Sequence, residues 1–223
     1  MSWHETIRRL EIRLTQPLPG DIAHEPLRAT PTGLVKPKFE HRVPPRPGSV
    51  LILLYPEGER LKFPLTKRQE YVGAHSAQVS FPGGKSEPNE SYLETALREA
   101  EEEIGVPGDL IKVIGKLSPF FVIPSNFLVT PVVAFAEKRP VFTPQLSEVD
   151  KIIEGDVNEL LRDDAVIVKE IVAAKIYPML APHFEIEGEI VWGATAMMLN
   201  EFRMVMKEVY HSQPVFYRSH NTI

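Results

Sequence analysis

A short stretch with four glutamates is the feature that most constrains what this chain can fold into and bind. Glu99, Glu102 and Glu103 stand at positions i, i+3 and i+4, so a helix places them on one face, within roughly 6 Å of each other. Glu101 adds a carboxylate, and Gly105 is the expected helix end, where the helix dipole favours cations over anions. Such a helix is destabilised unless a cation lies close by. Clustered carboxylate oxygens are ligands that Mg²⁺ prefers and that Mn²⁺ accepts.

The residues around this helix distinguish a metal site from the alternative, a solvated acidic helix face. Gly83 and Gly84 precede the helix, and paired glycines let the main chain approach a ligand closely. Arg98 lies beside the glutamates and is expected to pair with Glu90 in a charge-assisted bond that holds the preceding loop against the helix. Together these residues favour a cation site over a plain acidic surface.

The complete pattern resembles the signature of the Nudix hydrolases, G-x5-E-x7-R-E-U-x-E-E-x-G-U, in which U is an apolar residue. The match runs from Gly84 to Val106, and Ala100 and Val106 fill the apolar positions. The resemblance implies an α/β protein with the Nudix fold, an α/β/α sandwich around a mixed β-sheet. Strands before and after a helix on each face of a sheet favour the same layers. Gly83, Glu90, Arg98 and Gly105 are expected to be structural in this motif.

The resemblance also implies the chemistry. Glu99, Glu102 and Glu103 are expected to bind Mg²⁺, with the Gly84 carbonyl completing the metal shell, and the metal would assist attack of water on a diphosphate. Glu102 is the first candidate for the general base. Glu148, in the acidic segment 146–150, is the alternative base, and its other interpretation is a solvated loop residue.

A second stretch resembles the segment that precedes this signature in coenzyme A pyrophosphatases. It comprises Leu65-Thr66-Lys67-Arg68 and the run from His75 to Ser80. Ala77 departs from the subfamily pattern, which has glycine there, whereas His75 is expected to orient or pack rather than to bind metal. The resemblance implies Mg²⁺-dependent hydrolysis of coenzyme A or its derivatives to 4′-phosphopantetheine and adenosine 3′,5′-bisphosphate.

The expected substrate-binding residues are Lys67, Arg68, Ser80 and Phe127. Phe127 ends an apolar loop, residues 120–127, which forms either ordinary core closure or the rim of a substrate pocket. Arginine offers a bidentate fork to phosphate oxygens. Two other functions stay open: a Nudix pyrophosphatase for ADP-ribose or another nucleoside diphosphate derivative, and a non-catalytic binding module with the same fold.

Composition excludes several classes. The chain of 223 residues has no cysteine, which excludes disulfides, zinc-thiolate sites and a thiol nucleophile. Its net charge of −5 disfavours a general nucleic-acid binder, since no overall basic excess would attract a phosphate backbone. The start of the chain lacks a signal-peptide pattern, and no stretch approaches the ~20 apolar residues of a membrane helix. We therefore expect a cytoplasmic protein.

Three regions are expected: residues 1–48 as an N-terminal helix and proline-rich extension packed on the domain, 49–210 as the hydrolase domain, and 211–223 as a tail. Helical spacing predicts a helix over residues 2–14 with Ser2 as its cap. The prolines between Pro17 and Pro47 exclude regular helix and favour an extended arm on the surface or between subunits, with a flexible linker as the alternative. A homodimer is compatible with such an arm.

The hydrolase domain should begin with a buried strand, residues 49–55, followed by a hairpin partner over 61–67. Further strands are expected over 110–117 and 129–135. Pro131 predicts that the latter is an edge strand or has an irregular ladder. An apolar helix is expected over 190–206, with Trp192 at its start either buried in the core or shaping the pocket.

Overall fold

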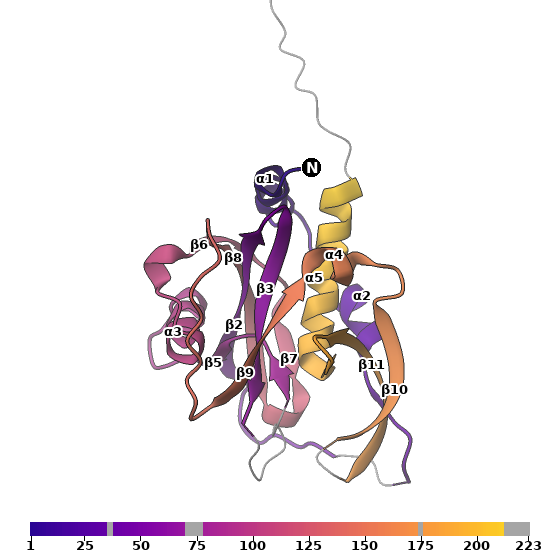
Figure 1. Ribbon diagram of the computed structural model, residues 1–223. Helices are drawn as coiled ribbons and strands as arrows, with labels where there is room; N and C mark the ends of the chain where they lie inside the picture. The colour runs from indigo at the N-terminus through magenta and orange to yellow at the C-terminus, as the bar shows by residue number, and fades with distance from the viewer. Residues whose placement is uncertain (35–37, 70–77, 174–175, 212–223) are drawn as a thin grey trace, which may run out of the picture.

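The computed structural model describes residues 1–34, 38–69, 78–173 and 176–211. Figure 1 shows a large sheet with α3 (Tyr92–Ile104) on one face and α5 (Gly193–His211) on the other, and a smaller sheet beyond α5. No helix in the described ranges is long and apolar enough to cross a membrane. The arrangement is an α/β/α sandwich around a mixed sheet, as the sequence predicts, with one additional layer.

The large sheet has eight strands and the order β4-β3-β2-β8-β6, while β5 pairs with β2, β7 with β8 and β9 with β3. Its strands are β2 (Arg46–Glu57), β3 (Arg60–Arg68), β4 (Val79–Ser80), β5 (Gly83–Lys85), β6 (Lys112–Lys116), β7 (Phe120–Val122), β8 (Phe127–Phe135) and β9 (Val149–Asp156). β2 and β8 pair in parallel, whereas β2 and β3 form the expected antiparallel hairpin. The sheet is therefore mixed.

β2 lies at the centre of the fold because both of its faces are buried. Leu51, Leu53 and Tyr55 belong to the core cluster that holds Ala96 and Ala100 of α3. Ile52 and Leu54 alternate with them and belong to the second cluster, which includes the buried side chains of α1 and α5. Successive strand residues point to opposite faces, so one uninterrupted apolar run supplies both cores.

Pro131 does not mark an edge strand, because β8 has neighbours on both sides. On the side away from β2, β6 pairs with Val132 to Phe135 and β7 pairs with Phe127 to Val129. Pro131 falls between these two partners, and its carbonyl accepts a hydrogen bond from Leu117 N–H at 2.9 Å. The alternative expectation of an irregular ladder is confirmed, since the missing proline N–H lies where the partner strand changes.

The smaller sheet was not expected from the sequence. β11 (Tyr177–Ile186) pairs with β1 (Thr30–Pro31), β10 (Val166–Ala173) and β12 (Glu189–Trp192). The predicted helix over 190–206 is wrong at its start, because residues 190–192 form β12 and the helix begins at Gly193, where φ is +64°. The strand predicted over 110–117 is also shorter, since Leu110 belongs to the 3₁₀ turn η2 (Gly108–Leu110).

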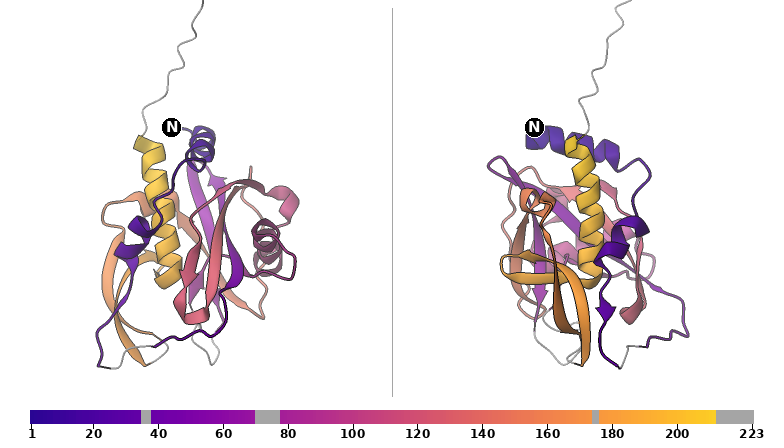
Figure 2. Two further views of the ribbon diagram at one scale, coloured as in Figure 1. Left: turned by 180° about the vertical axis from the view of Figure 1, so that it is seen from behind. Right: turned by 90° about the vertical axis from the view of Figure 1, so that its right-hand side faces the viewer.

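α5 lies between the two sheets (Figures 1 and 2). Its buried residues are Thr195 to Phe202, Val205, Met206 and Val209. Because α5 is covered by a sheet on each side, it is apolar on most sides rather than along one stripe. α4 (Val157–Leu161), the remaining helix of this region, follows β9 and packs against α5 near Leu160, whose carbonyl accepts a bond from Arg203 Nε at 2.8 Å.

The N-terminal helix α1 (Trp3–Arg13) confirms the predicted helix, and the Ser2 side chain accepts a bond from Glu5 N–H as its cap. Figure 2 shows α1 lying across one end of α5. Leu10 is fully buried, and Arg13 Nε binds a carboxylate oxygen of Glu208 in α5 at 2.5 Å. The helix is thus fixed to the rest of the fold by apolar packing and by a polar bond.

The proline-rich segment is more regular than predicted. It contains α2 (Asp21–His24) and the 3₁₀ turn η1 (Glu25–Leu27), so its prolines do not exclude all helix. Pro26 lies in the first turn of η1, where the missing N–H has no partner to lose. Residues 17–31 pack along α5 and β11, which excludes a flexible linker over this part of the arm. The three-region division at residues 48 and 210 stays a prediction.

We predict that Leu10→Ala lowers the free energy of unfolding by about 2 to 5 kcal/mol, because it leaves a cavity between α1 and the core. Ile12→Ala is the matched control on the same helix; Ile12 is 52% exposed, so its change should stay within about 0.5 kcal/mol. Urea unfolding measures both. Equal, small effects would show that α1 contributes little to the stability of the domain.

Candidate active site

α3 carries the clustered glutamates and has defined signals at both ends. Ser91 and Glu94 form a capping box at its start, and Gly105 ends it with φ of +70°, the left-handed conformation expected for this glycine. The carbonyls of the last turn are bound by a later segment, since Gln145 N–H donates to the Glu103 carbonyl at 3.0 Å and Thr143 N–H to the Ile104 carbonyl at 2.9 Å. These bonds hold residues 143–149, and therefore Glu148, close to the acidic end of α3.

Gly83 and Gly84 are required by two close approaches. A Cβ on Gly83 would lie 2.3 Å from the Ser49 carbonyl oxygen, and the φ of Gly83 is +152°. A Cβ on Gly84 would lie 2.5 Å from Oε1 of Glu99. The Glu99 carboxylate therefore occupies the space beside the main chain at Gly84 that any side chain there would fill. Glu103 lies beside the same loop, because Gly83 N–H donates to its Oε2 at 3.1 Å.

Arg98 links the loop and the glutamates. Its Nε and Nη2 donate to the two oxygens of Glu90 at 2.8 and 3.0 Å, which is the pairing expected from the sequence. This bond is the main cause that lowers the pKa of Glu90 to about 2. Nη1 of Arg98 donates to Glu99 at 2.9 Å and to Glu102 at 3.0 Å. Arg98 is thus a cation close to these glutamates, and it offsets part of the like-charge repulsion on α3 without a metal.

Glu99 and Glu103 differ from Glu102 in their surroundings. Glu103 is 6% exposed and the Glu99 side chain 15%, whereas the Glu102 side chain is 60% exposed. Burial raises the pKa of Glu99, and burial raises that of Glu103 to about 7 despite the opposing effects of the Gly83 N–H and Arg68. Both acids therefore lie where a positive charge would be most stabilising.

The donor set fits a hard divalent cation that keeps some of its water. No group of three or more His, Cys, Asp or Glu side chains arranged to hold a metal ion occurs among the described residues. The carboxylates of Glu99 and Glu103 nevertheless both lie against the main chain of Gly83 and Gly84. Mg²⁺ is commonly bound by one or two carboxylates together with water and substrate phosphates, so this smaller set suffices.

A cavity of about 590 Å³ opens beside this site. Its polar end contains Glu99, Glu103, Glu148, Arg68 and Lys85 beside Gly83 and Gly84. Its apolar wall is formed by Phe120, Val122, Phe127, Val129, Met179, Trp192, Met197 and Met198. The cavity can therefore receive a ligand with an anionic part and a sizeable apolar or aromatic part.

The structure brings most of the expected site residues to this cavity. Arg68, Ser80, Phe127 and Glu148 line it, together with the glycines and the two buried glutamates. Lys67 does not line it, because its Nζ binds Glu189 of β12 at 3.0 Å. Glu102 is likewise outside the lining and is bound to Arg98. His75 and Ala77 lie outside the described residues.

Several lining residues had no role in the sequence analysis. Arg28 and Ala29 come from the proline-rich arm, and Met179 comes from β11. Met197 and Met198 of α5 are buried and also line the cavity. Trp192 lines the cavity, as one of its two interpretations proposed. No sequence motif around Arg28 predicts a binding role, because the residue reaches the cavity only through the path of the arm in the folded protein.

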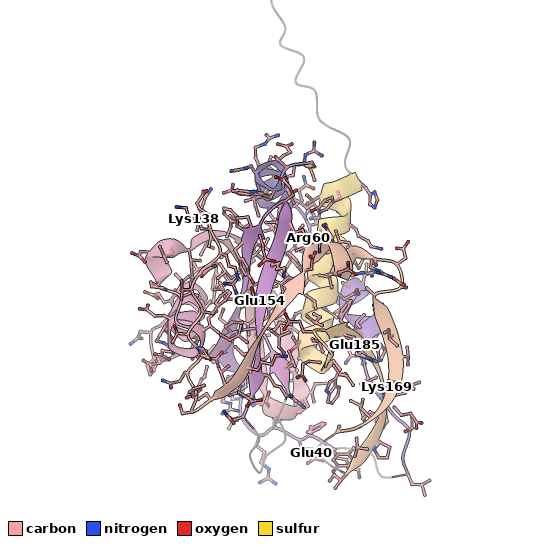
Figure 3. All side chains as sticks on the ribbon, in the orientation of Figure 1. Glu40, Arg60, Lys138, Glu154, Lys169 and Glu185 are labelled. Carbon is pink, nitrogen blue, oxygen red and sulfur yellow. The ribbon has the colours of Figure 1, made fainter. Side chains whose placement is uncertain are left out.

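A second cavity of about 520 Å³ lies between the large sheet and β11, near Arg60, Glu154 and Glu185 (Figure 3). Its cations are already paired, Arg60 with Asp156 at 3.1 Å, Lys62 with Glu57 at 2.8 Å, and Arg162 with Asp164 at 2.8 Å. Its least exposed carboxylates, Asp156 and Glu154, pair with Arg60 and Arg139, whereas Glu103 of the first cavity is buried with a pKa raised to about 7. The first cavity is therefore the stronger candidate for an active site.

The family assignment agrees with this geometry. A model of the NUDIX domain matches residues 45–174, which is more than half of the 223 residues. The chain belongs to the Nudix family. The matched residues contain the loop at Gly83 and Gly84, all of α3, and Glu148. The segments before and after them supply the arm, all of β11 and β12, and α5.

Curated Nudix relatives are similar over much of their length. The uncharacterized Nudix hydrolase NudL of Yersinia enterocolitica is 35% identical over 136 residues, which cover 60% of this chain and 69% of that protein. NudL of Yersinia pestis is 34% identical over 140 residues, covering 60% and 67%. Among solved structures, a MutT/nudix family protein from Enterococcus faecalis is similar with a TM-score of 0.48 and 19% identity, covering 80% of this chain and 67% of that one.

The Nudix fold predicted from the signature is thus confirmed. The protein is a Nudix hydrolase, an enzyme that cleaves the diphosphate link of nucleoside diphosphate derivatives. Nudix hydrolases generally use divalent metals such as Mg²⁺.

The raised pKa of Glu103 predicts how the metal-free protein responds to pH. Between pH 4.5 and about 7 the folded protein holds a proton on Glu103 that the unfolded chain releases, so stability should fall as pH rises through this window. One pKa unit corresponds to about 1.4 kcal/mol, which makes the loss about 3 kcal/mol. Glu103→Gln should remove this loss, measured by urea unfolding in a chelating buffer at pH 5 and pH 7.5.

Glu101→Gln is the matched control for that measurement, since Glu101 is an exposed neighbour on the same helix. It should follow the wild-type pH profile. A wild-type profile that Glu103→Gln leaves unchanged would contradict the assignment of the raised pKa to Glu103.

Proposed function

We propose that this Nudix enzyme hydrolyses the diphosphate of coenzyme A or its derivatives, with Mg²⁺ as its cofactor and Mn²⁺ as a substitute. The observation that carries the proposal is a single cavity lined both by the carboxylates of Glu99, Glu103 and Glu148 and by many apolar side chains. Such a cavity fits a diphosphate attached to bulky groups better than it fits inorganic diphosphate. The products would be 4′-phosphopantetheine, or its acyl form, and adenosine 3′,5′-bisphosphate.

The roles of the acidic residues follow from their burial. Glu99, Glu103 and the Gly84 carbonyl would hold the metal, because Glu99 fills the space beside Gly84 and Glu103 accepts a bond from Gly83 N–H next to it. When bound, Mg²⁺ would polarise the phosphoryl group and lower the pKa of a coordinated water. Arg98 and Glu90 would keep the loop and α3 in register without touching the substrate.

We infer that Glu148 rather than Glu102 is the general base. Glu148 lines the cavity and interacts electrostatically with Glu99 and Glu103, so it lies near the proposed metal site. Glu102 points away into solvent and binds Arg98. A base must come within hydrogen-bond reach of the attacking water, directly or through one more water, and this favours Glu148.

The substrate-binding groups are divided between the two ends of the cavity. Arg68, next to the carboxylates, would bind phosphate oxygens as the remaining cation of the Lys67-Arg68 pair. Ser80 lines the same end, with its hydroxyl 3.3 Å from that of Thr66. Phe127 would stack on an aromatic or apolar group, and Arg46 already lies over its ring at 4.2 Å from the centroid. A homodimer and a cytoplasmic location complete the proposal as predictions from the sequence.

The principal alternative keeps the catalytic residues and changes the substrate to ADP-ribose or another nucleoside diphosphate derivative. The purified protein should be incubated with Mg²⁺ and a panel that contains coenzyme A, acyl-coenzyme A, ADP-ribose and dinucleoside polyphosphates. We expect the highest kcat/KM for coenzyme A or an acyl derivative, because these fill the apolar wall. Turnover of ADP-ribose well above that of coenzyme A would reject the proposed substrate but would leave the assignment of the catalytic residues intact.

The assignment of the base predicts unequal effects of two substitutions. Glu148→Gln should reduce kcat by about 10² to 10⁴, the usual contribution of a general base. Glu102→Gln should reduce it by much less, because Glu102 is exposed and outside the cavity. Steady-state kinetics at saturating Mg²⁺ measures both. The reverse order of effects would restore Glu102 as the base.

A further inference from the structure

The lining of the cavity includes a segment of the proline-rich arm. Arg28 and Ala29 line the cavity although they precede residue 45, where the match to the family model begins. They connect η1 to β1, the short strand that pairs with β11 in the smaller sheet. In Figure 1 this smaller sheet lies on the side of α5 away from α3. The arm therefore reaches the cavity from the side of the smaller sheet, whereas Glu99 and Glu103 reach it from α3.

Buried polar bonds from α5 fix the arm before it reaches the cavity. Glu201 is fully buried; it accepts bonds from Gly20 N–H at 2.9 Å and from the Ser118 hydroxyl at 2.6 Å, and it lies 3.0 Å from Nε2 of His24. Asn200 Nδ2 donates to the Ala23 carbonyl at 2.7 Å. A buried carboxylate with this many partners would be costly to release, so residues 20–24 have one defined position.

The main chain on both sides of Arg28 is also fixed. Leu27, just before it, is 1% exposed and belongs to the main core cluster. Arg28 N–H donates to the Glu25 carbonyl at 3.1 Å. Just after it, Thr30 and Pro31 pair with β11. Arg28 is therefore carried on a rigid backbone, which lowers the entropic cost of binding a ligand through its side chain.

The guanidinium of Arg28 has free binding capacity. Its Nε donates to Glu25 at 2.8 Å, and within the described part of the chain Glu25 is the one hydrogen-bond partner of this side chain. The two side chains are 45% and 68% exposed, so the pair is weak and easily rearranged. An arginine has five N–H donors, which leaves the outer edge of the group able to bind an anion bidentately.

We propose that Arg28 is a specificity-determining residue that binds a phosphomonoester of the substrate, at a distance from the diphosphate that is hydrolysed. The inference rests on the proposed function and deepens it. A coenzyme A-like substrate carries such a group on its adenosine ribose, and ADP-ribose does not. Arg68 lies beside the buried carboxylates and serves the diphosphate, so a second phosphate needs a second cation, which the arm supplies.

Binding of two nucleotides, one of them a product of the proposed reaction, tests this role without requiring turnover. Titration calorimetry compares adenosine 3′,5′-bisphosphate with adenosine 5′-monophosphate, which lacks only the second phosphate. The wild-type protein should bind the bisphosphate about ten-fold more tightly, since a charge-assisted bond of this kind contributes at least that much. Arg28→Gln should reduce the difference to less than about two-fold.

The matched control is Arg8→Gln. Arg8 also pairs with a glutamate three residues before it, at 3.0 Å, and it lies on the outer surface of α1 away from the cavity. This variant should keep the wild-type difference, and thermal unfolding should show that both variants are folded.

A ten-fold difference that survives in Arg28→Gln, or a wild-type protein that does not distinguish the two nucleotides, would overturn the role of Arg28. Hydrolysis of coenzyme A is a separate measurement. A protein that hydrolyses coenzyme A but binds both nucleotides equally would keep the proposed function and reject the inference. A protein that prefers the bisphosphate through Arg28 but does not hydrolyse coenzyme A would keep the role of Arg28 and reject the proposed function.

Discussion

The site depends on the burial of Glu99 and Glu103 against the main chain of Gly83 and Gly84. Each glycine lets a carboxylate or a neighbouring strand approach where a Cβ would collide. The burial has an electrostatic cost, seen in the raised pKa of both acids. Arg98 offsets part of this electrostatic cost by pairing with Glu99. A bound divalent cation would offset the rest.

The rest of the molecule supplies the substrate side of the same cavity. α3 and its loop belong to the residues matched by the family model, whereas Met179, Trp192 and Met198 follow them and Arg28 precedes them. α5 joins these parts, since it packs on the large sheet, contacts the smaller sheet and binds the arm through Glu201. The residues proposed for catalysis and those proposed to select the substrate thus lie in different segments of the chain, and α5 contacts both parts of the fold.

Local spacing made the catalytic helix predictable, because the positions of Glu99, Glu103 and Gly105 depend only on helix geometry. Lys67 shows where such reasoning stops. It adjoins Arg68 on β3, where the pairing with β9 shifts register between the two residues, and one of the two side chains lines the cavity. The sequence does not tell which. The smaller sheet was missed for a related reason: β11 contains Pro178 and Pro182, which weaken a strand pattern, and its pairing with β1 joins residues about 150 positions apart.

Arg98 has a consequence for how the enzyme can be regulated. Because this residue already links Glu90, Glu99 and Glu102, the acidic helix has an internal counter-ion and does not need a metal in order to fold. Metal binding is then separate from folding, unlike in small domains that unfold when their ion is removed. With the proposed metal site, activity would follow the free concentration of the divalent metal reversibly, and the protein would stay folded but inactive whenever that ion is scarce.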